Sequence, residues 1–194
     1  MDNKEINQGR RRFLTLATAG AGGVAAIGVA SPLVASFFPS EKAKAAGAAV
    51  EVDVSKIESG QLMTAEWRGK PIWILNRTEQ QVKNLPTLDG ELADPKSEVE
   101  HQPEYCKNDV RSIKPNLWVC IGICTHLGCS PEMVAEIRPE PYDPQWKGGY
   151  FCPCHKSRFD MSGRVFKDVP APINLLVPPH ASTEDVLMRT RVEN

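Results

Sequence analysis

The sequence predicts a mainly β protein, in which one membrane-spanning helix at the N-terminus precedes an antiparallel β head. Three observations lead to this fold class. The 26 residues of the range 13–38 include no charged side chain. After them, short apolar or alternating segments recur through the 194-residue chain, separated by glycine and proline. Because only one short segment of the head has a helix-start pattern, we expect many short strands and little helix there.

The composition excludes several classes of protein. Hydrophobic residues make up 41% and charged residues 24%, which suits one domain with a core plus terminal appendages. The net charge of −1 gives no electrostatic reason to expect nucleic acid as a partner. Six cysteines are too few for a disulfide scaffold of this length. Four of the six lie within the range 124–154, so they indicate a single site.

The first 40 residues have the features of an export signal that is kept as a membrane anchor. Residues 1–12 have a local net charge of +2, and Arg10 and Arg11 belong to an Arg-Arg-Arg-Phe-Leu stretch that resembles a twin-arginine signal. The alternative is an ordinary positive-inside anchor. As a helix, the uncharged run would measure about 39 Å, which is enough to cross a hydrocarbon core of about 30 Å. The positive end should stay in the cytoplasm, which places the head in the periplasm beyond a bacterial inner membrane.

An alanine-rich segment, residues 41–49, separates the anchor from the head and is expected to be a flexible tether. Nine residues span about 13 Å as a helix and about 30 Å when extended, so the tether could move the head by many ångströms. Ala43-Lys44-Ala45 has the form of a signal peptidase site. We expect the single-pass anchor to be retained, because such a tether suits a head that stays attached. The predicted parts are the cytoplasmic region 1–12, the anchor 13–40, the tether 41–49 and the head 50–194.

Strand candidates follow one another along the head. Alternating valines at 50–54 have the period of a half-buried strand. Thr78 and Gln81 form a capping-box pattern, which predicts a short helix ending near Pro86. Residues 87–116 are polar and rich in proline, so loop and short helix are expected there. The strand candidates are 50–54, 62–67, 71–76, 117–123, 133–137, 149–151, 164–166, 174–177 and 186–191.

Two short loops carry the chemistry of the head. They read Cys-Thr-His-Leu-Gly-Cys at 124–129 and Cys-Pro-Cys-His-Lys-Ser at 152–157, and each follows a strand candidate. Two cysteines and two histidines suit a tetrahedral zinc site, or a [2Fe–2S] cluster with both histidines on one iron. The cluster is favoured because the loops lack Cys-x-x-Cys knuckles and because zinc would leave Cys129 and Cys154 over. Outside the cytoplasm those two cysteines could form a disulfide between the loops.

These loops resemble the defining motif of the Rieske iron–sulfur family. Within that family the chain is similar to the Rieske subunits of ubiquinol–cytochrome c reductases, the cytochrome bc complexes. Segments 52–55, 69–72 and 170–172 add to the resemblance, which covers essentially residues 10–192. It implies a Rieske-type antiparallel head with an inserted cluster-binding subdomain at about 118–172. It also implies one Rieske-type [2Fe–2S] cluster as the cofactor.

The resemblance also implies a role for each residue of the site. The metal ligands are two thiolates on one iron and two imidazoles on the other: Cys124 and Cys152, and His126 and His155. Cys129 pairs with Cys154, and His155 is the ligand that meets the quinol. The hydroxyl of Ser157 bonds a bridging sulfide. Pro170-Ala171-Pro172 is a lid that excludes water from the cluster.

The implied function is electron transfer. The head takes one electron and one proton from quinol bound in cytochrome b. It then swings on its tether to a membrane-bound c-type cytochrome, within a dimeric complex. Two thiolates and two neutral imidazoles leave an oxidised cluster uncharged, whereas four thiolates would give −2, so reduction is easier. The alternatives are a Rieske subunit of another exported oxidoreductase, such as arsenite oxidase, and a structural zinc module.

Two residues near the second loop depart from the family pattern. Phe159 replaces a common tyrosine, so one hydrogen bond to a cluster cysteine should be missing and the midpoint potential should fall. Lys156 replaces the usual glycine, and its positive charge opposes that effect. We predict that the lost hydrogen bond has the larger effect.

Several other residues have no part in the motif. Cys106 and Cys120 are without a role there, and Cys120 is expected to be a buried free thiol. His101 and His180 lie in polar, proline-flanked stretches, so we expect them at the surface. The four tryptophans are expected to pack in the core or at an interface.

Overall fold

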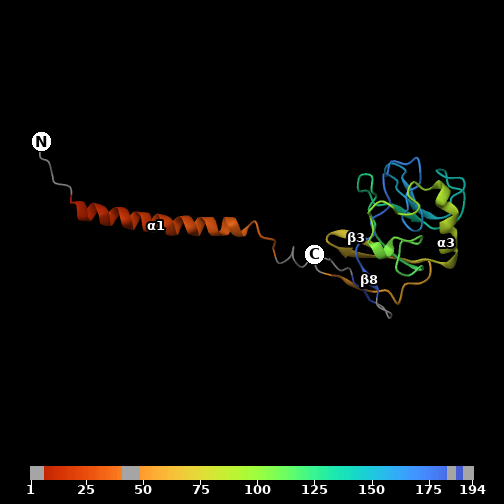
Figure 1. Ribbon diagram of the computed structural model, residues 1–194, viewed down its shortest axis with the longest axis horizontal. Helices are drawn as coiled ribbons and strands as arrows, with labels where there is room; N and C mark the ends of the chain where they lie inside the picture. Colours follow the sequence, from red (N-terminus) through yellow and green to blue (C-terminus); the bar gives the residue numbers. More distant parts are fainter. Residues whose placement is uncertain (1–6, 41–48, 183–186, 190–194) are drawn as a thin grey trace. The chain divides into compact units, whose positions relative to one another are not determined.

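The computed structural model describes residues 7–40, 49–182 and 187–189 (Figure 1). The chain divides into two compact units, Met1–Ala45 and Ala46–Asn194. Of the predicted tether, residues 41–48 lie outside the described residues.

The first unit contains the helix α1 (Gln8–Ala35). It begins before the uncharged run because the side chain of Asn7 caps it, accepting a hydrogen bond of 3.1 Å from the N–H of Arg10. Its 28 residues include a window with a mean hydropathy of 1.7, so the helix is long and apolar enough to cross a membrane. The hydroxyl of Thr18 donates to the carbonyl of Leu14 at 2.8 Å, which satisfies a polar group within the apolar segment.

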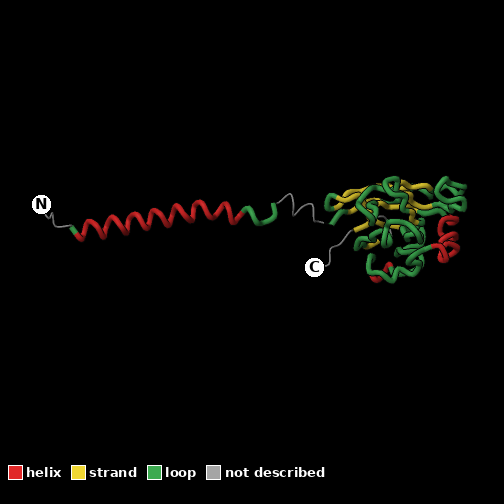
Figure 2. The backbone as a smooth tube through the Cα atoms, turned by 90° about the horizontal axis from the view of Figure 1, so that it is seen from above, coloured by secondary structure: helices red, strands yellow, loops and turns green. Residues whose placement is uncertain are grey.

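The described residues of the head form three three-stranded sheets in which all strand pairs are antiparallel, which confirms the predicted mainly β class. Figure 2 shows long loops between the short strands. The first sheet contains, in spatial order, β1 (Glu51–Asp53), β9 (Leu187–Arg189) and β8 (Ala181–Ser182). The second contains β2 (Leu62–Trp67), β3 (Lys70–Asn76) and β4 (Leu117–Ile121). The third contains β5 (Glu132–Val134), β6 (Gly149–Phe151) and β7 (Arg158–Phe159).

One α-helix and two 3-10 helices lie between β3 and β4. The helix α3 (Glu79–Asn84) has the predicted capping box, in which Thr78 and Gln81 each bond the other's backbone N–H. The 3-10 helices are η1 (Leu85–Glu91) and η2 (Glu104–Cys106). The prediction of loop and short helix for 87–116 is therefore confirmed.

In the central sheet, β2–β3–β4, the strands β3 and β4 are buried on both faces. On β3, Trp73 and Leu75 pack into the cluster that contains the site cysteines, whereas Ile72 and Ile74 pack into a second cluster on the other face. Strand β4 alternates in the same way. This double burial explains why β4 reads as a continuous apolar run in the sequence. The site loop that follows β4 therefore starts from a firmly packed strand.

Two of the predicted strands are wrong. Residues 164–166 form only single bridges, from Val165 to Phe159 and from Phe166 to Leu92. Residues 174–177 form no ladder, because their backbone bonds go to three separate segments. The bonded pairs are Leu175 N–H with Gly163, Leu176 carbonyl with Ile121, and Val177 N–H with His101. The two-residue strands β7 and β8 were not predicted, since two residues are too short to show a period.

The prediction that His101 and His180 lie at the surface is also wrong. His180 is 5% exposed, and burial lowers its pKa. His101 is half-buried, and its Nδ1 lies 2.7 Å from the carbonyl of Asn174. The expectation for Cys120 is confirmed, since Cys106 and Cys120 are both buried free thiols. The tryptophans are buried, as expected.

Three buried arginines connect the segments around the central sheet. Arg77 donates to the hydroxyls of Ser112 and Ser162, and burial lowers its pKa to about 10, so it stays charged at neutral pH. Arg111 donates to the carbonyls of Ser162, Gly163 and Leu175, among others. Arg164 binds the carboxylate of Asp160 at 2.7 Å. These contacts fix the turn that follows β7 beside the segment 174–177.

Candidate metal centre

The two loops of the site have the same backbone design. In the first loop, which follows β4, the N–H of Cys124 donates to the carbonyl of Cys129 at 2.7 Å. The N–H of Gly128 donates to the carbonyl of Cys124 at 3.1 Å. In the second, which follows β6, the N–H of Cys152 donates to the carbonyl five residues later at 2.8 Å. The N–H of Lys156 donates to the carbonyl of Cys152 at 2.9 Å. Each loop therefore holds its first cysteine in an equivalent position.

Both of these first cysteines are buried and near each other. Cys124 and Cys152 are each 2% exposed and belong to one core cluster. The thiol of Cys124 lies within hydrogen-bonding reach of the Cys152 thiol, the Ser157 hydroxyl and the backbone N–H of His126. Burial is the main cause that raises the pKa of the Cys124 thiol. Two thiols so close together in an apolar site are suited to share a metal.

Two imidazoles, one from each loop, also lie together. The ring centroids of His126 and His155 are 4.7 Å apart, and the rings are nearly perpendicular, at 89°. The Nδ1 atom of His126 is buried and has no hydrogen-bond partner among the described residues. A buried nitrogen without a partner is costly unless it binds something else, such as a metal. The two loops thus bring the two predicted thiol ligands together and the two predicted imidazole ligands together. Two sulfurs and two nitrogens are a combination that fits the implied cluster and also fits zinc.

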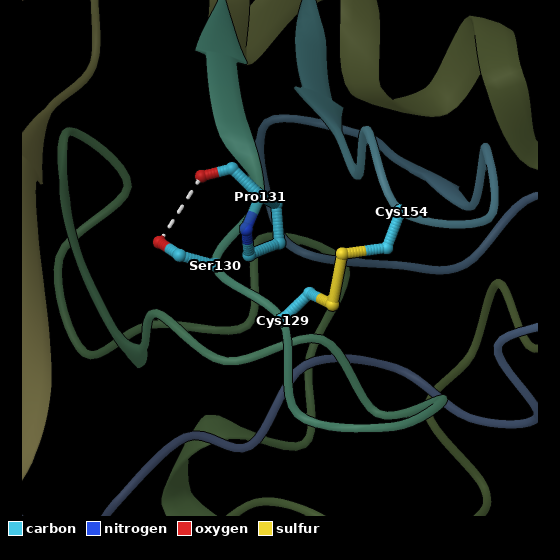
Figure 3. The surroundings of a disulfide bond; sticks show 4 residues. All are labelled: Cys129, Ser130, Pro131 and Cys154. Carbon is cyan, nitrogen blue, oxygen red and sulfur yellow. Dashed lines mark hydrogen bonds between the residues drawn. A yellow bond between two sulfur atoms is a disulfide. The ribbon is translucent and has the colours of Figure 1, made fainter.

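A disulfide joins the tips of the two loops (Figure 3). It links Cys129 and Cys154, whose Cα atoms are 6.6 Å apart. The sulfur of Cys152 lies within 4.8 Å of both of these sulfurs. That group of three is not itself a metal site, because disulfide sulfurs are not thiolates. The pairing is the one implied by the family resemblance, and it leaves Cys124 and Cys152 as the thiols of the site.

The predicted lid is hydrogen-bonded to the second loop, and the residue that follows the lid is hydrogen-bonded to the first. The N–H of Ala171 donates to the Ser157 hydroxyl at 3.0 Å, and the hydroxyl of Thr125 donates to the carbonyl of Ile173 at 2.7 Å. Ser157 is fully buried. Its hydroxyl bonds the lid and also lies within hydrogen-bonding reach of the Cys124 thiol. Thr125 was not singled out from the sequence. Its position between two predicted ligands was the only available signal.

One face of the site is open. His155 and Lys156 are exposed, and Leu127 of the other loop is 72% exposed. Phe159, by contrast, is fully buried in the core cluster of the two cysteines. The exposed ring of His155 can therefore meet a partner, while the thiol side of the site is closed by the protein core.

Removal of the disulfide is expected to lower the free energy of unfolding by about 3.5 kcal/mol, because the bond connects residues 25 apart in sequence. The variant replaces both Cys129 and Cys154 by alanine, so that no spare thiol remains beside Cys152. Thermal unfolding of the full-length protein in detergent measures the loss. The matched control is Cys106→Ala, at a buried free cysteine outside the site. If the double variant lost no more stability than this control, the disulfide would not stabilise the head.

Two family models match the chain. "Rieske [2Fe-2S] domain" matches residues 48–179, and "Ubiquitinol-cytochrome C reductase Fe-S subunit TAT signal" matches residues 1–40. Among curated proteins, the ubiquinol-cytochrome c reductase iron-sulfur subunit of Allochromatium vinosum is 51% identical, with 95% of this chain and 89% of the relative covered. The subunit of the same name from Blastochloris viridis is 39% identical, with coverages of 93% and 91%. A chain of a solved hyperthermophilic respiratory Complex III is 25% identical, with coverages of 89% and 98% and a TM-score of 0.48.

Proposed function

Because the chain belongs to the Rieske [2Fe–2S] family, and within it to the ubiquinol–cytochrome c reductase iron–sulfur subunits, we propose that it is the electron-carrying Rieske subunit of a respiratory cytochrome bc complex. The observation that carries the proposal is that two loops of equal design bring two buried thiols together and two imidazoles together. Subunits of this name belong to an oxidoreductase that oxidises quinol and reduces cytochrome c. We propose that reaction for the complex that contains this chain.

One [2Fe–2S] cluster fits the site. We assign one iron to Cys124 and Cys152 and the other to His126 and His155, so that the orphaned Nδ1 of His126 gains a partner. When bound, the cluster supplies a one-electron acceptor with an unusually high potential for an iron–sulfur centre. The disulfide between Cys129 and Cys154 keeps the two loops together on either side of it.

The side chains around the site have distinct roles in this proposal. His155 is exposed, and its distal ring nitrogen is the atom that accepts a hydrogen bond and a proton from quinol. The Ser157 hydroxyl donates a hydrogen bond toward the thiolate side of the site, which stabilises added negative charge there. The lid 170–172 excludes water beside Ser157, because Ala171 is buried and its N–H is bonded to the Ser157 hydroxyl.

The anchor and the partners complete the proposal. The twin-arginine signal model and the apolar helix α1 support an exported, membrane-anchored subunit. We propose a single-pass orientation in the bacterial inner membrane, with residues 1–12 in the cytoplasm and the head, residues 50–194, in the periplasm. Residues 13–40 are then the anchor and 41–49 the tether. The proposed partners are cytochrome b, a membrane-bound c-type cytochrome and quinol, in a dimeric complex.

Electron paramagnetic resonance on membranes tests the proposal. After reduction with dithionite we expect an anisotropic Rieske-type signal, together with copurification of b-type and c-type haem. A silent spectrum with one bound zinc per chain would contradict the cluster. A Rieske signal in a preparation that contains a molybdenum protein in place of cytochromes would move the chain to another exported oxidoreductase.

Phe159→Tyr is expected to raise the midpoint potential by on the order of 40 mV, equivalent to about 1 kcal/mol for one electron. Phe159 packs in the same core cluster as both proposed thiol ligands, and we expect a tyrosine hydroxyl there to donate to one of their sulfurs. Protein-film voltammetry measures the change. The control is Phe151→Tyr, which adds the same hydroxyl where the ring stacks on Tyr142 at 4.0 Å. An unchanged or lower potential in Phe159→Tyr alone would contradict this reasoning.

A further inference from the structure

The two site loops place different residues at the same left-handed backbone position. Gly128 has φ 84° and Lys156 has φ 61°, and each donates its N–H to the first cysteine of its own loop. Glycine takes this conformation freely, whereas a residue with a Cβ atom costs about 1 kcal/mol. Gly128 in the first loop shows that glycine can hold this conformation and make the same backbone hydrogen bond. The second loop therefore contains strain that the fold itself does not require.

The side chain of Lys156 makes no hydrogen bond or ion pair with the described residues that would offset this strain. It is exposed, and its ammonium has no hydrogen bond or ion pair with any residue that the structure describes. It is also the only charged residue in the two loops, 124–129 and 152–157. Strain that persists without an internal benefit points to a role for the side chain outside the chain.

The surroundings of Lys156 indicate what that role is. It follows His155 directly and lies on the same open face of the site, where Leu127 is 72% exposed. An exposed apolar side chain next to a single unpaired cation has the composition of a docking surface for a partner with a carboxylate.

The two proposed partners differ in how well they suit a cation. Quinol is uncharged, and burial of an ammonium in an apolar quinol pocket is costly. A c-type cytochrome meets the head in water, where its acidic side chains and haem propionates are carboxylates within reach of an approaching ammonium.

We propose that Lys156 is a docking residue for the electron acceptor, pairing its ammonium with a carboxylate of the c-type cytochrome. The pair orients the open face of the head so that His155 approaches the haem. This inference rests on the proposed function, since it requires a c-type cytochrome as the acceptor.

Zero-length carbodiimide cross-linking of the purified complex tests the proposal. We expect a peptide containing Lys156 joined by an amide bond to the c-type cytochrome, and mass spectrometry distinguishes an acidic side chain from a haem propionate. Lys156→Arg keeps the charge but cannot form the amide, so it should lose the cross-link and keep rapid electron transfer. Lys156→Gln should lose both. Lys167→Gln is the matched control, because the Lys167 ammonium is already bound to the carbonyl of Gly90 at 2.8 Å.

Kinetics provide the second readout. Electron transfer from the reduced head to the c-type haem should be about 3- to 5-fold slower in Lys156→Gln at low ionic strength. The difference should disappear at about 0.5 M salt, where exposed pairs are screened. Lys156→Gly should show the same slowing while its thermal stability rises, because the strain is removed.

Each outcome has a separate meaning. A rate difference that persists at high salt would show an effect on the midpoint potential, not on docking, and would overturn the proposal. Exclusive cross-linking to cytochrome b, or equal rates in the glutamine variant and the wild type, would also overturn it. The Rieske signal is recorded on the same samples, so failure of the proposed function is seen independently as a missing signal.

Discussion

Cys124→Ala is expected to give a membrane-anchored protein with no Rieske signal and a complex without measurable quinol oxidation. In the proposed site the thiol of Cys124 is one of four donors, and it lies within hydrogen-bonding reach of the Cys152 thiol. Its loss would therefore leave one iron without half of its proposed protein ligands. The disulfide and both histidines are untouched. Iron content, the resonance signal and quinol–cytochrome c reductase activity of isolated membranes measure the result.

Cys120→Ala is the matched control for this prediction. Cys120 is also a buried free cysteine, and it lies only four residues earlier on β4. Its thiol packs in the core and is not among the proposed ligands, so this variant should keep its iron and lose only about 1 kcal/mol of stability. A Rieske signal of normal size in Cys124→Ala would remove this cysteine from the ligand set.

Asp160→Asn is expected to lower the free energy of unfolding by about 3–5 kcal/mol, the usual cost of breaking a buried ion pair. Both residues of the pair are buried, since Asp160 is 0% exposed and Arg164 1%. The Asp160 carboxylate accepts from the N–H groups of Ser162 and Arg164 and from Nε of Arg164 at 2.7 Å. An asparagine side chain has only one acceptor oxygen. It would therefore present to the guanidinium either its NH2 group, which is a donor, or an uncharged carbonyl, which is a weaker acceptor than a carboxylate.

Thermal unfolding measures this effect, and the expected shift in Tm is about 10 °C. The control is Asp89→Asn, which removes the other carboxylate that binds Arg164, at 2.8 Å. Because the Asp89 side chain is 34% exposed, its loss should cost less than about 1 kcal/mol. Equal losses in the two variants would contradict the special role of the buried carboxylate.

The elements with a clear period or a local signal could be predicted from the sequence. Strand β2 has the predicted bounds, and β4 was visible as an apolar run because both of its faces are buried. The capping box alone identified α3. The loops of the site were recognisable because cysteine and histidine at these spacings have few other uses.

Other features depend on tertiary contacts that leave no local pattern. The segment 174–177 is apolar and extended, yet it bonds to three separate partners and forms no strand. Arg77 and Arg111 were not singled out from the sequence, and both are buried against carbonyl and hydroxyl groups from distant segments. His180 is buried because the hydroxyl of Tyr105, 75 residues away, bonds its backbone N–H and carbonyl.

The two loops and the segment 171–173, which begins in the lid, form a closed ring. The disulfide connects loop to loop, the Ser157 hydroxyl connects the second loop to Ala171, and Thr125 connects the first loop to Ile173. A ring closed by three such connections resists displacement when one electron is added to its centre. The protein around the cofactor then rearranges little between the two redox states. A small reorganisation energy of this kind allows rapid electron transfer even when the driving force is slight.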